Sequence, residues 1–385
     1  MTDLVTAPAV TGAERAARLA AVRTRMRERG LDALVVVGPE NVYYLTGLDS
    51  QGYFAFTALL VTASGPPAVL TRAMEGPTVR EQAPDCAHVP YADGEAPAPA
   101  LLAALRARVP AGARIGLERA SMFFPPAVAA RLRGRRTGLR WCDASDLVAG
   151  VRAVKSAAEI ACTRAAAALS DRAMAAGIAA VRAGAEERAV AAAVYRELIA
   201  GGGEPPGFAP LIRPLALLAQ EHVTWSGRTV GDGLFFELSA SVRRYHAPLS
   251  RTVYAGRPPA GAARAHEAAL AGLAAIGGAL RPGRTLESVY AAWRDAVEAV
   301  CPQAGAPPRH HCGYLVGIGF PPSWVGGAVH GIRPGDDTVV RAGMTFHALS
   351  WVQRPAGHVV SDTLLVTADG AESLTTTARG LTVAS

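Results

Sequence analysis

The chain has 385 residues, of which 50% are hydrophobic, 18% charged and 6% aromatic. This composition is typical of a folded globular protein and excludes disordered and fibrous classes. The net charge is +7, but Lys155 is the only lysine and the arginines are scattered without aromatic residues between them. A nucleic-acid-binding protein is therefore not expected, because such proteins interleave a basic surface with stacking rings.

Five cysteines are spread along the chain without any Cys-x-x-Cys pair: Cys86, Cys142, Cys162, Cys301 and Cys312. An odd and dispersed set argues against a disulfide framework and a structural zinc site, and fits a reducing compartment. The first residues show no basic start followed by an apolar run, and no apolar stretch of about 18 residues follows. We therefore expect a cytoplasmic protein without a membrane segment.

The first part of the chain alternates helical and strand-like segments. Residues 14–29 carry apolar residues at helical spacing, and residues 31–38 form an apolar run that ends at a glycine. Strand-like segments are then predicted at 41–48, 56–62, 67–74 and 113–118, and helices at 98–109 and 125–134. This order predicts a mixed α/β domain over residues 1–150.

The second part repeats a pattern of two helices followed by strands. Helices are predicted over 154–181, where Ser156 and Glu159 make a capping box, and over 186–200, before a run of three glycines. Strands follow at 232–241 and 243–256, helices at 260–280 and 285–300, and strands at 314–320, 344–352 and 358–367. The sequence therefore predicts a second domain over residues 151–385 and an α+β protein.

Several polar side chains stand among apolar neighbours in these predicted strands and loops: His222, Glu237, His246, Tyr314, His347 and Asp362. Burial of such a group without a partner costs several kcal/mol, so each must be paired or must serve a function. Spacing alone leaves satisfied core histidines at 246 and 347 equally open, and a hydrogen bond at a strand turn explains Asp362. His310, His311 and His330 are predicted to be solvated loop residues.

Motifs of the commonest enzyme classes are absent. The sequence contains no G-x-S-x-G nucleophile elbow, no H-E-x-x-H zinc motif, no Walker loop and no dinucleotide glycine fingerprint. The glycines of GIGF at 317–320 are explained by close backbone approach rather than by phosphate binding.

Five segments together resemble a known family. The segment RAVKSAAEIACTRAAAALSDRA, the strand pair GDGLFFELSASVRRYHAPLSRTVYAG, and then CGYLVGIGFPPSW, GMTFHALSW and SDTLLVTADG follow in the order seen in prolidases, methionine and Xaa-Pro aminopeptidases and creatinases. Residues 14–150 resemble the creatinase-type N-terminal domain. The resemblance implies a creatinase-like N-terminal α/β domain followed by a pita-bread C-terminal domain.

The positions that match the family's metal ligands carry other residues here. The metallopeptidases of the family bind two metal ions through two aspartates, a histidine and two glutamates. These positions are matched by Glu237, Pro248, Tyr314, Leu349 and Ser361. One carboxylate cannot replace the several oxygen ligands that such ions need, so neither a metal nor another cofactor is expected.

The strand pair and GYLVGIGFPPSW look most like the metal-independent creatinases and ectoine hydrolases, and Leu349 favours the ectoine hydrolase side. This resemblance implies hydrolysis of a C–N bond in a small guanidinium or cyclic amidine acid. Glu237 would hold the cationic carbon centre, and His222, which matches the family's catalytic histidine, would be the general base. His246, Tyr314 and His347 are assigned as further donors or proton relays.

Substrate-binding residues are assigned on the same hypothesis. Trp324 and Trp351 would form an aromatic wall against the cation, and Arg244 or Arg251 would hold a substrate carboxylate. The family also implies a homodimer in which the partner's N-terminal domain reaches the active site. The loop 43–54, with Asp49 and Tyr53, is the candidate for that contact, and an ordinary dimer surface is the alternative.

Three other functions remain open at this stage. The scaffold could perform lyase, cyclase or amide chemistry, it could be a metal-dependent Xaa-Pro peptidase with unrecognised ligands, or it could bind a small molecule without turnover. The expected partner is a small molecule, not a nucleic acid or a membrane, and the non-catalytic alternative also allows a protein partner.

Overall fold

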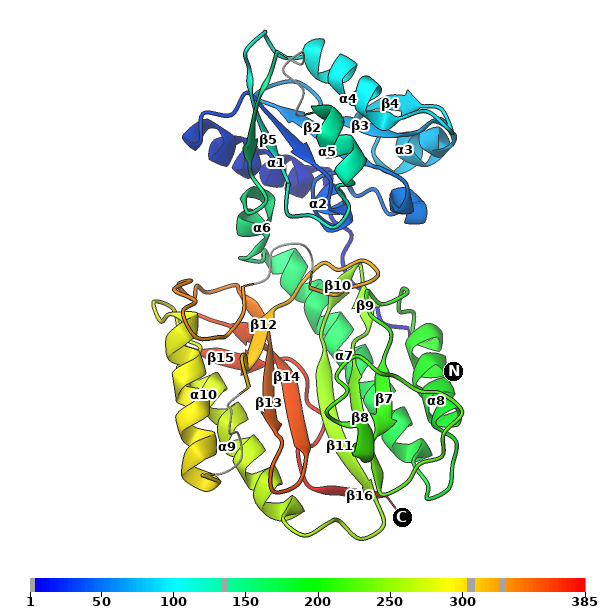
Figure 1. Cartoon of the computed structure of the whole chain (residues 1–385), viewed down its shortest axis with the longest axis vertical. Coiled ribbons are helices and arrows are strands. Elements are labelled where there is room, and N and C mark those ends of the chain that lie inside the picture. Colours follow the sequence, from blue (N-terminus) through cyan, green and yellow to red (C-terminus); the bar gives the residue numbers. More distant parts are fainter. Residues whose placement is uncertain (1–3, 133–137, 303–308, 326–329, 385) are drawn as a thin grey trace. The chain divides into compact units, whose positions relative to one another are not determined.

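The computed structural model describes residues 4–132, 138–302, 309–325 and 330–384 (Figure 1). The chain divides into two compact units, one of residues 10–152 and the other of residues 4–9, 153–325 and 330–384. The sequence prediction drew one boundary near residue 150 and placed the start of the chain in the first domain. The backbone N–H of Val5 donates to the carbonyl of Gly201 at 2.9 Å, so residues 4–9 belong with the second unit.

The N-terminal unit is a six-stranded sheet in the order β4-β3-β2-β1-β5-β6, and it carries helices α1 to α6. β1 pairs antiparallel with β2 and parallel with β5. The strands are β1 Ala33–Val36, β2 Ala58–Thr62, β3 Ala68–Arg72, β4 Ala87–Tyr91, β5 Arg114–Leu117 and β6 Arg140–Asp143. The helices are α1 Gly12–Glu28, α2 Pro39–Thr46, α3 Gly76–Gln82, α4 Pro97–Arg106, α5 Pro126–Leu132 and α6 Leu147–Arg152.

The strand predicted over residues 41–48 is wrong, because this segment is helix α2. Pro39 stands at its first turn, and Gly47 ends it with a φ of 82°. Glu118 is distant from this segment in the sequence. Its buried carboxylate accepts hydrogen bonds from the N–H groups of Val37 and Gly38 at 2.7 and 2.8 Å. These donors lie just before the first turn of the helix, so a residue distant in the sequence fixes the turn from β1 into α2, which the local pattern could not reveal.

The C-terminal unit is built on an eight-stranded sheet, with the order β12-β13-β14-β11-β8-β7 and with β15 beside β14 and β16 beside β11. Its main strands are β7 Leu211–Pro214, β8 Gly233–Leu238, β11 Leu249–Ala255, β12 Gly313–Leu315, β13 Thr345–Val352 and β14 His358–Val366. The shorter ones are β9 Ser241–Val242, β10 Tyr245–His246, β15 Ala371–Ser373 and β16 Thr382–Ala384. The helices are α7 Ala157–Ala180, α8 Glu187–Ala200, α9 Ala262–Ala279 and α10 Leu286–Val300. The predicted α+β class and the order of two helix pairs and strands are confirmed (Figure 1).

The two faces of this sheet have different roles. One face packs against the helices through apolar residues at alternate positions of the strands. Phe236 and Val253 pack with residues of α7 and α8, and Phe346 and Leu364 pack with residues of α9 and α10. Because side chains alternate along a strand, the residues between them point to the other face. Strand register pairs Ser250 with Glu237 and with Ser361, which places these polar residues together on the face away from the helices.

A buried ion pair joins β11 to β14. Arg251 donates to Asp362 at 2.9 Å, and the two side chains are 3% and 0% exposed. The other N–H groups of Arg251 donate to backbone carbonyls, among them those of Ser250 and Ser361 at 2.8 and 2.7 Å. Arg379 adds a second bond to Asp362 at 2.6 Å. The polar groups of this pair are therefore satisfied by the sheet and by the segment 377–379.

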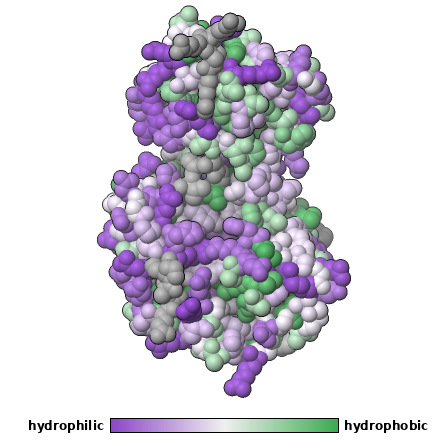
Figure 2. Space-filling model, viewed as in Figure 1, coloured by the Kyte–Doolittle hydropathy of each residue, from purple (hydrophilic) through white to green (hydrophobic). Residues whose placement is uncertain are grey.

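No helix in the described ranges is long and apolar enough to cross a membrane. On the face of the molecule drawn in Figure 2, hydrophilic residues alternate with smaller hydrophobic patches.

Replacement of Asp362 by Asn is expected to lower the free energy of unfolding by about 3–5 kcal/mol, because it leaves the charge of Arg251 buried without its counterion. The matched control is Glu372→Gln, which breaks an exposed pair with Arg164 and is expected to cost about 1 kcal/mol or less. Urea unfolding measures both variants. Equal losses in the two variants would contradict the assigned role of the pair.

Candidate active site

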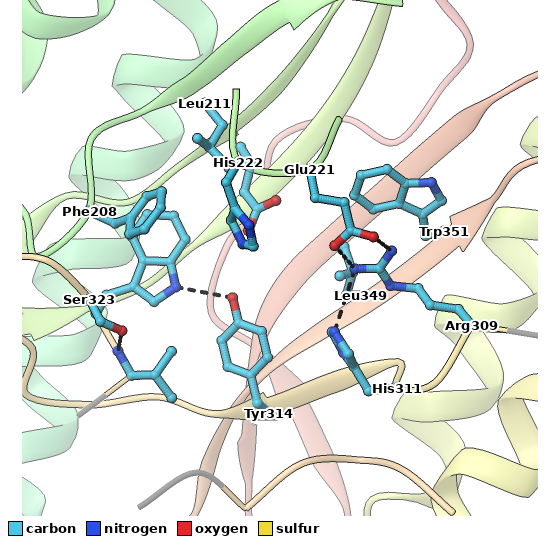
Figure 3. Close-up of a pocket in the computed structure, with 13 residues that line it drawn as sticks. Phe208, Leu211, Glu221, His222, Arg309, His311, Tyr314, Ser323, Leu349 and Trp351 are labelled. Atoms are coloured by element: carbon cyan, nitrogen blue, oxygen red, sulfur yellow. Dashed lines mark hydrogen bonds and ion pairs between the residues drawn. The ribbon is translucent and has the colours of Figure 1, made fainter. Parts of the chain in front are cut away.

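A cavity of about 190 Å³ lies on the helix-free face of the C-terminal sheet (Figure 3). Strands β7, β8, β12 and β13 and the loops beside them form its walls. The residues that line it are Phe208, Leu211, Glu221, His222, Glu237, Arg309, His311, Tyr314, Ser323, Trp324, Val325, Leu349 and Trp351. The structure thus brings together five of the predicted site residues, namely His222, Glu237, Tyr314, Trp324 and Trp351.

Glu237 stands on β8 with 7% of its surface exposed. Burial raises the pKa of its carboxyl to about 7, against the opposing effect of the arginines 213 and 309. No donor among the described residues lies within hydrogen-bond distance of this carboxylate, and Nδ1 of His347 is 3.9 Å from Oε1. A buried carboxylate without a donor favours a ligand that brings its own positive charge or N–H groups.

A chain of hydrogen bonds runs from the pocket into the sheet. The indole N–H of Trp324 donates to the hydroxyl of Tyr314 at 3.1 Å, and that hydroxyl lies 2.9 Å from Nδ1 of His347. Nε2 of His347 lies 2.6 Å from the hydroxyl of Ser361. Burial lowers the pKa of His347 to about 3, so its ring is neutral and carries a single proton on one of its nitrogens.

Three of the positions that match metal ligands in the metallopeptidases surround this imidazole: Glu237, Tyr314 and Ser361. The other two, Pro248 and Leu349, offer no ligand atom from their side chains. In the described part of the chain no group of three His, Cys, Asp or Glu side chains is arranged to hold a metal ion. The donor set therefore does not fit a pair of hard dications, which need several carboxylate oxygens.

His222 lies in the loop between β7 and β8. In Figure 3 its ring and the Tyr314 ring enter the pocket from opposite sides. Neither of its ring nitrogens has a hydrogen-bond partner among the described residues, and its ring centroid is 6.2 Å from that of Phe208. Both nitrogens are therefore free to bind a water molecule or a substrate group.

A cation that the sequence did not point to lines the pocket. Arg309 forms two bonds with Glu221, at 2.7 and 2.8 Å, and its guanidinium carbon lies 4.4 Å from the centroid of the Trp351 ring. Arg309 follows the sequence APP, which reads as a solvated loop, so its position was missed. The one available signal was Glu221, which directly precedes His222.

His311 also lines the pocket, although the sequence predicted a solvated loop residue. Burial, and after it the charge of Arg309, lowers the pKa of His311 to about 4. The Trp351 ring is also approached by the buried Arg213, whose guanidinium carbon lies 5.8 Å from its centroid. Burial lowers the pKa of Arg213 to about 10. The guanidinium groups of Arg309 and Arg213 therefore both lie near the Trp351 ring, and the charge of Arg309 is paired with Glu221.

His347 is completely buried behind Tyr314, and it meets the pocket only through Tyr314 and Glu237. His246 does not line the pocket. Its Nε2 accepts the N–H of Gly207 at 2.8 Å, and its Nδ1 bonds the carbonyl of Arg244 at 2.9 Å. Burial lowers the pKa of His246 to about 4. His246 is thus a satisfied core histidine that fixes two loops.

Neither predicted carboxylate-binding arginine lines the pocket. Arg251 is committed to Asp362 and to the carbonyls described above. Arg244 donates to the carbonyl of Pro205 at 3.2 Å and stacks over Phe320 at 4.6 Å. Arg309 is the arginine that the fold brings to the pocket wall.

Asp49 and Tyr53 belong to the N-terminal unit. The backbone N–H of Asp49 donates to the side chain of Gln82 at 2.7 Å, and the Tyr53 ring packs edge-on against Phe123 with centroids 5.5 Å apart. A contact of these residues with the active site of a dimer partner stays a prediction.

Comparison with known proteins agrees with this architecture. Residues 161–368 match the model of "Metallopeptidase family M24", and residues 18–154 match that of the "Creatinase/Prolidase N-terminal domain". The chain therefore belongs to the M24 family of hydrolases, with a creatinase-type N-terminal domain.

Individual relatives cover nearly all of the chain. It is 30% identical to the ectoine hydrolase of Halomonas elongata, over 97% of this chain and 98% of that protein. It is 31% identical to an uncharacterized hydrolase/peptidase of Sinorhizobium fredii, over 96% and 97% of the two chains. The crystal structure of dipeptidase PepE from Mycobacterium ulcerans superposes with a TM-score of 0.80 at 25% identity, over 97% and 98% of the two chains.

The raised pKa of Glu237 predicts a pH-dependent term in stability. The carboxyl holds its proton in the folded chain at pH values where it has lost it in the unfolded chain. Its contribution is therefore fully present below its unfolded pKa of about 4.5 and is lost as the pH rises to about 7. Urea unfolding of the chain and of Glu237→Gln should show the variant gaining relative stability over this range, by up to about 1.4 kcal/mol per pH unit. A difference that does not change with pH would contradict the burial of an unpaired carboxyl.

Proposed function

We propose that this protein hydrolyses a C–N bond in a small cyclic amidine or guanidinium acid, without a metal ion. The observation that carries the proposal is the buried carboxylate of Glu237, which faces the cavity and has no hydrogen-bond donor among the described residues. A planar amidinium supplies a positive charge and N–H donors in the geometry that a carboxylate accepts. The similarity to the ectoine hydrolase of Halomonas elongata favours a cyclic amidine over a guanidinium substrate.

The reaction begins with a water molecule held by His222. Glu237 binds the amidinium N–H groups and so keeps the positive charge on the carbon that is attacked. The oxygen of the water forms a bond to this carbon while His222 takes one proton from the water. The C–N bond then breaks as the leaving nitrogen receives that proton. The remaining hydroxyl proton passes to the released amine as the carbonyl forms, so the products are a neutral amide and an ammonium ion. For a guanidinium substrate the amide is a urea.

Tyr314 faces the reacting carbon from the other side of the pocket. When the proton of His347 lies on Nδ1, it is donated to the Tyr314 oxygen, which also accepts the indole N–H of Trp324. The hydroxyl proton of Tyr314 then points away from both donors and is free for the substrate. The neutral ring of His347 and the hydroxyl of Ser361 thus position the proton of Tyr314.

Arg309 is the group that would hold a substrate carboxylate. Glu221 fixes its guanidinium through two bonds, and the Trp351 ring covers one face. Arg309 thereby takes the role predicted for Arg244 or Arg251. The substrate would lie with its amidinium at Glu237 and its carboxylate toward Arg309.

The organisation of the protein follows the same proposal. We propose a cytoplasmic homodimer whose partner is a small-molecule substrate and not a nucleic acid or a membrane. The absence of usable ligand atoms at positions 248 and 349 supports catalysis without metal, because the family's dinuclear chemistry needs ligands at both.

Replacement of Glu237 by Gln should reduce turnover of a cyclic amidine acid at least about a thousandfold, because the amide cannot stabilise the amidinium charge. Replacement of His222 by Asn should reduce kcat roughly 100- to 10,000-fold, because the general base is lost. Product formation by chromatography measures both variants. Glu372→Gln, on the surface away from the pocket, is the control. Near-normal activity of either pocket variant would contradict the mechanism.

Replacement of Arg309 by Lys keeps the charge beside Glu221 but removes the guanidinium fork. It should raise KM roughly tenfold for a substrate with a carboxylate and change KM little for the analogue without one. Steady-state kinetics on the two substrates decides this point. An equal change for both would show that Arg309 does not recognise the carboxylate.

A further inference from the structure

A second and larger cavity adjoins the candidate active site. It measures about 740 Å³ and lies between the end of α8 and the segments 203–211 and 321–322. We call it the apolar chamber, after its walls of Leu198, Ile199, Pro206, Phe208, Ala209 and Pro322. Ile199 is 70% exposed, so the chamber is open to solvent.

The chamber and the catalytic pocket are continuous. Phe208, Leu211 and His222 line both cavities. In Figure 3, Phe208 lies on the side of the pocket away from Arg309. If the carboxylate of a ligand points to Arg309, the opposite end of that ligand therefore points to the chamber. His222 lies at the junction of the pocket and the chamber.

Two polar side chains of the chamber wall, Glu204 and Thr224, are occupied within the protein. The carboxylate of Glu204 accepts the backbone N–H groups of Arg243 and Arg244 at 3.0 and 2.7 Å. The hydroxyl of Thr224 donates to the carbonyl of Pro210 at 2.6 Å. The chamber thus presents mainly carbon to a ligand, and burial of an apolar group there is favourable.

We propose that the substrate carries an apolar arm on the carbon of its amidine group, and that this arm binds in the apolar chamber. This inference rests on the proposed function and names its substrate class more closely. The chamber, at about 740 Å³, is much larger than the catalytic pocket of about 190 Å³ and has room for such an arm. Hydrolysis at the junction converts the amidine carbon into the carbonyl of an amide, so the product is an acylated amino acid whose acyl chain still lies in the chamber.

Calorimetric titration of the full chain with two simple amidinium ions tests the chamber without turnover. Acetamidinium carries only the head group, and hexanamidinium adds four methylenes. Each methylene buried from water is worth roughly threefold to fourfold in affinity, so hexanamidinium should bind at least about tenfold more tightly. Ala209→Trp, which fills the chamber, should bring the two affinities within about threefold of each other. Ala260→Trp, at an exposed alanine that lines neither cavity, should leave the difference intact.

The outcomes separate this inference from the proposed function. If the two ions bind with equal affinity and Glu237→Gln abolishes the binding of both, the proposed binding of an apolar arm in the chamber is overturned. The same result would support the amidinium site at Glu237. Failure of both ions to bind, or binding that does not depend on Glu237, would overturn the proposed function and this inference with it. Sedimentation measures the oligomeric state of the chain and of Ala209→Trp. If the chain is a dimer and Ala209→Trp dissociates it, a second copy of the chain covers the chamber, and the inference is overturned.

Discussion

The strict alternation of side chains along β8, β11, β13 and β14 is the constraint on which the rest of the C-terminal unit depends. One face of these strands is apolar and is covered by the four helices, while the other face carries Glu237, Ser250, Ser361 and Leu349. A shift of one residue in any of these strands would exchange the two sets. The buried pair of Arg251 and Asp362 joins β11 to β14 and so helps to fix the register on which the pocket depends.

The chemistry of the pocket follows from what replaces the family's metal ligands. Where the metallopeptidases place ligands, this chain has one carboxylate, a phenol and a small hydroxyl around the neutral ring of His347. A site of this kind cannot polarise a neutral amide as two metal ions do. On the proposed function it stabilises a substrate that is itself a cation, and Arg309, held by Glu221 and the Trp351 ring, would bind a carboxylate of that substrate.

Sequence reasoning predicted the two-part architecture and five residues of the pocket, because Glu237 and Tyr314 interrupt apolar strands in an obvious way. It could not distinguish His246 from His347, since both stand in buried strands and only the fold shows that His246 bonds two backbone groups. Arg251 was misassigned for the same reason. Arg309 was missed because its partner Glu221 is 88 residues away in the chain.

The central claim is that Glu237 performs, for a cationic substrate, the task that metal ions perform elsewhere in the family. The most direct test is the metal content of catalytically active protein, purified without chelator and analysed by elemental mass spectrometry. The account predicts well below one metal ion per chain, and unchanged turnover of a cyclic amidine acid after dialysis against a chelator. Two manganese, zinc or iron ions per active chain would contradict the account and would indicate a metal-dependent peptidase.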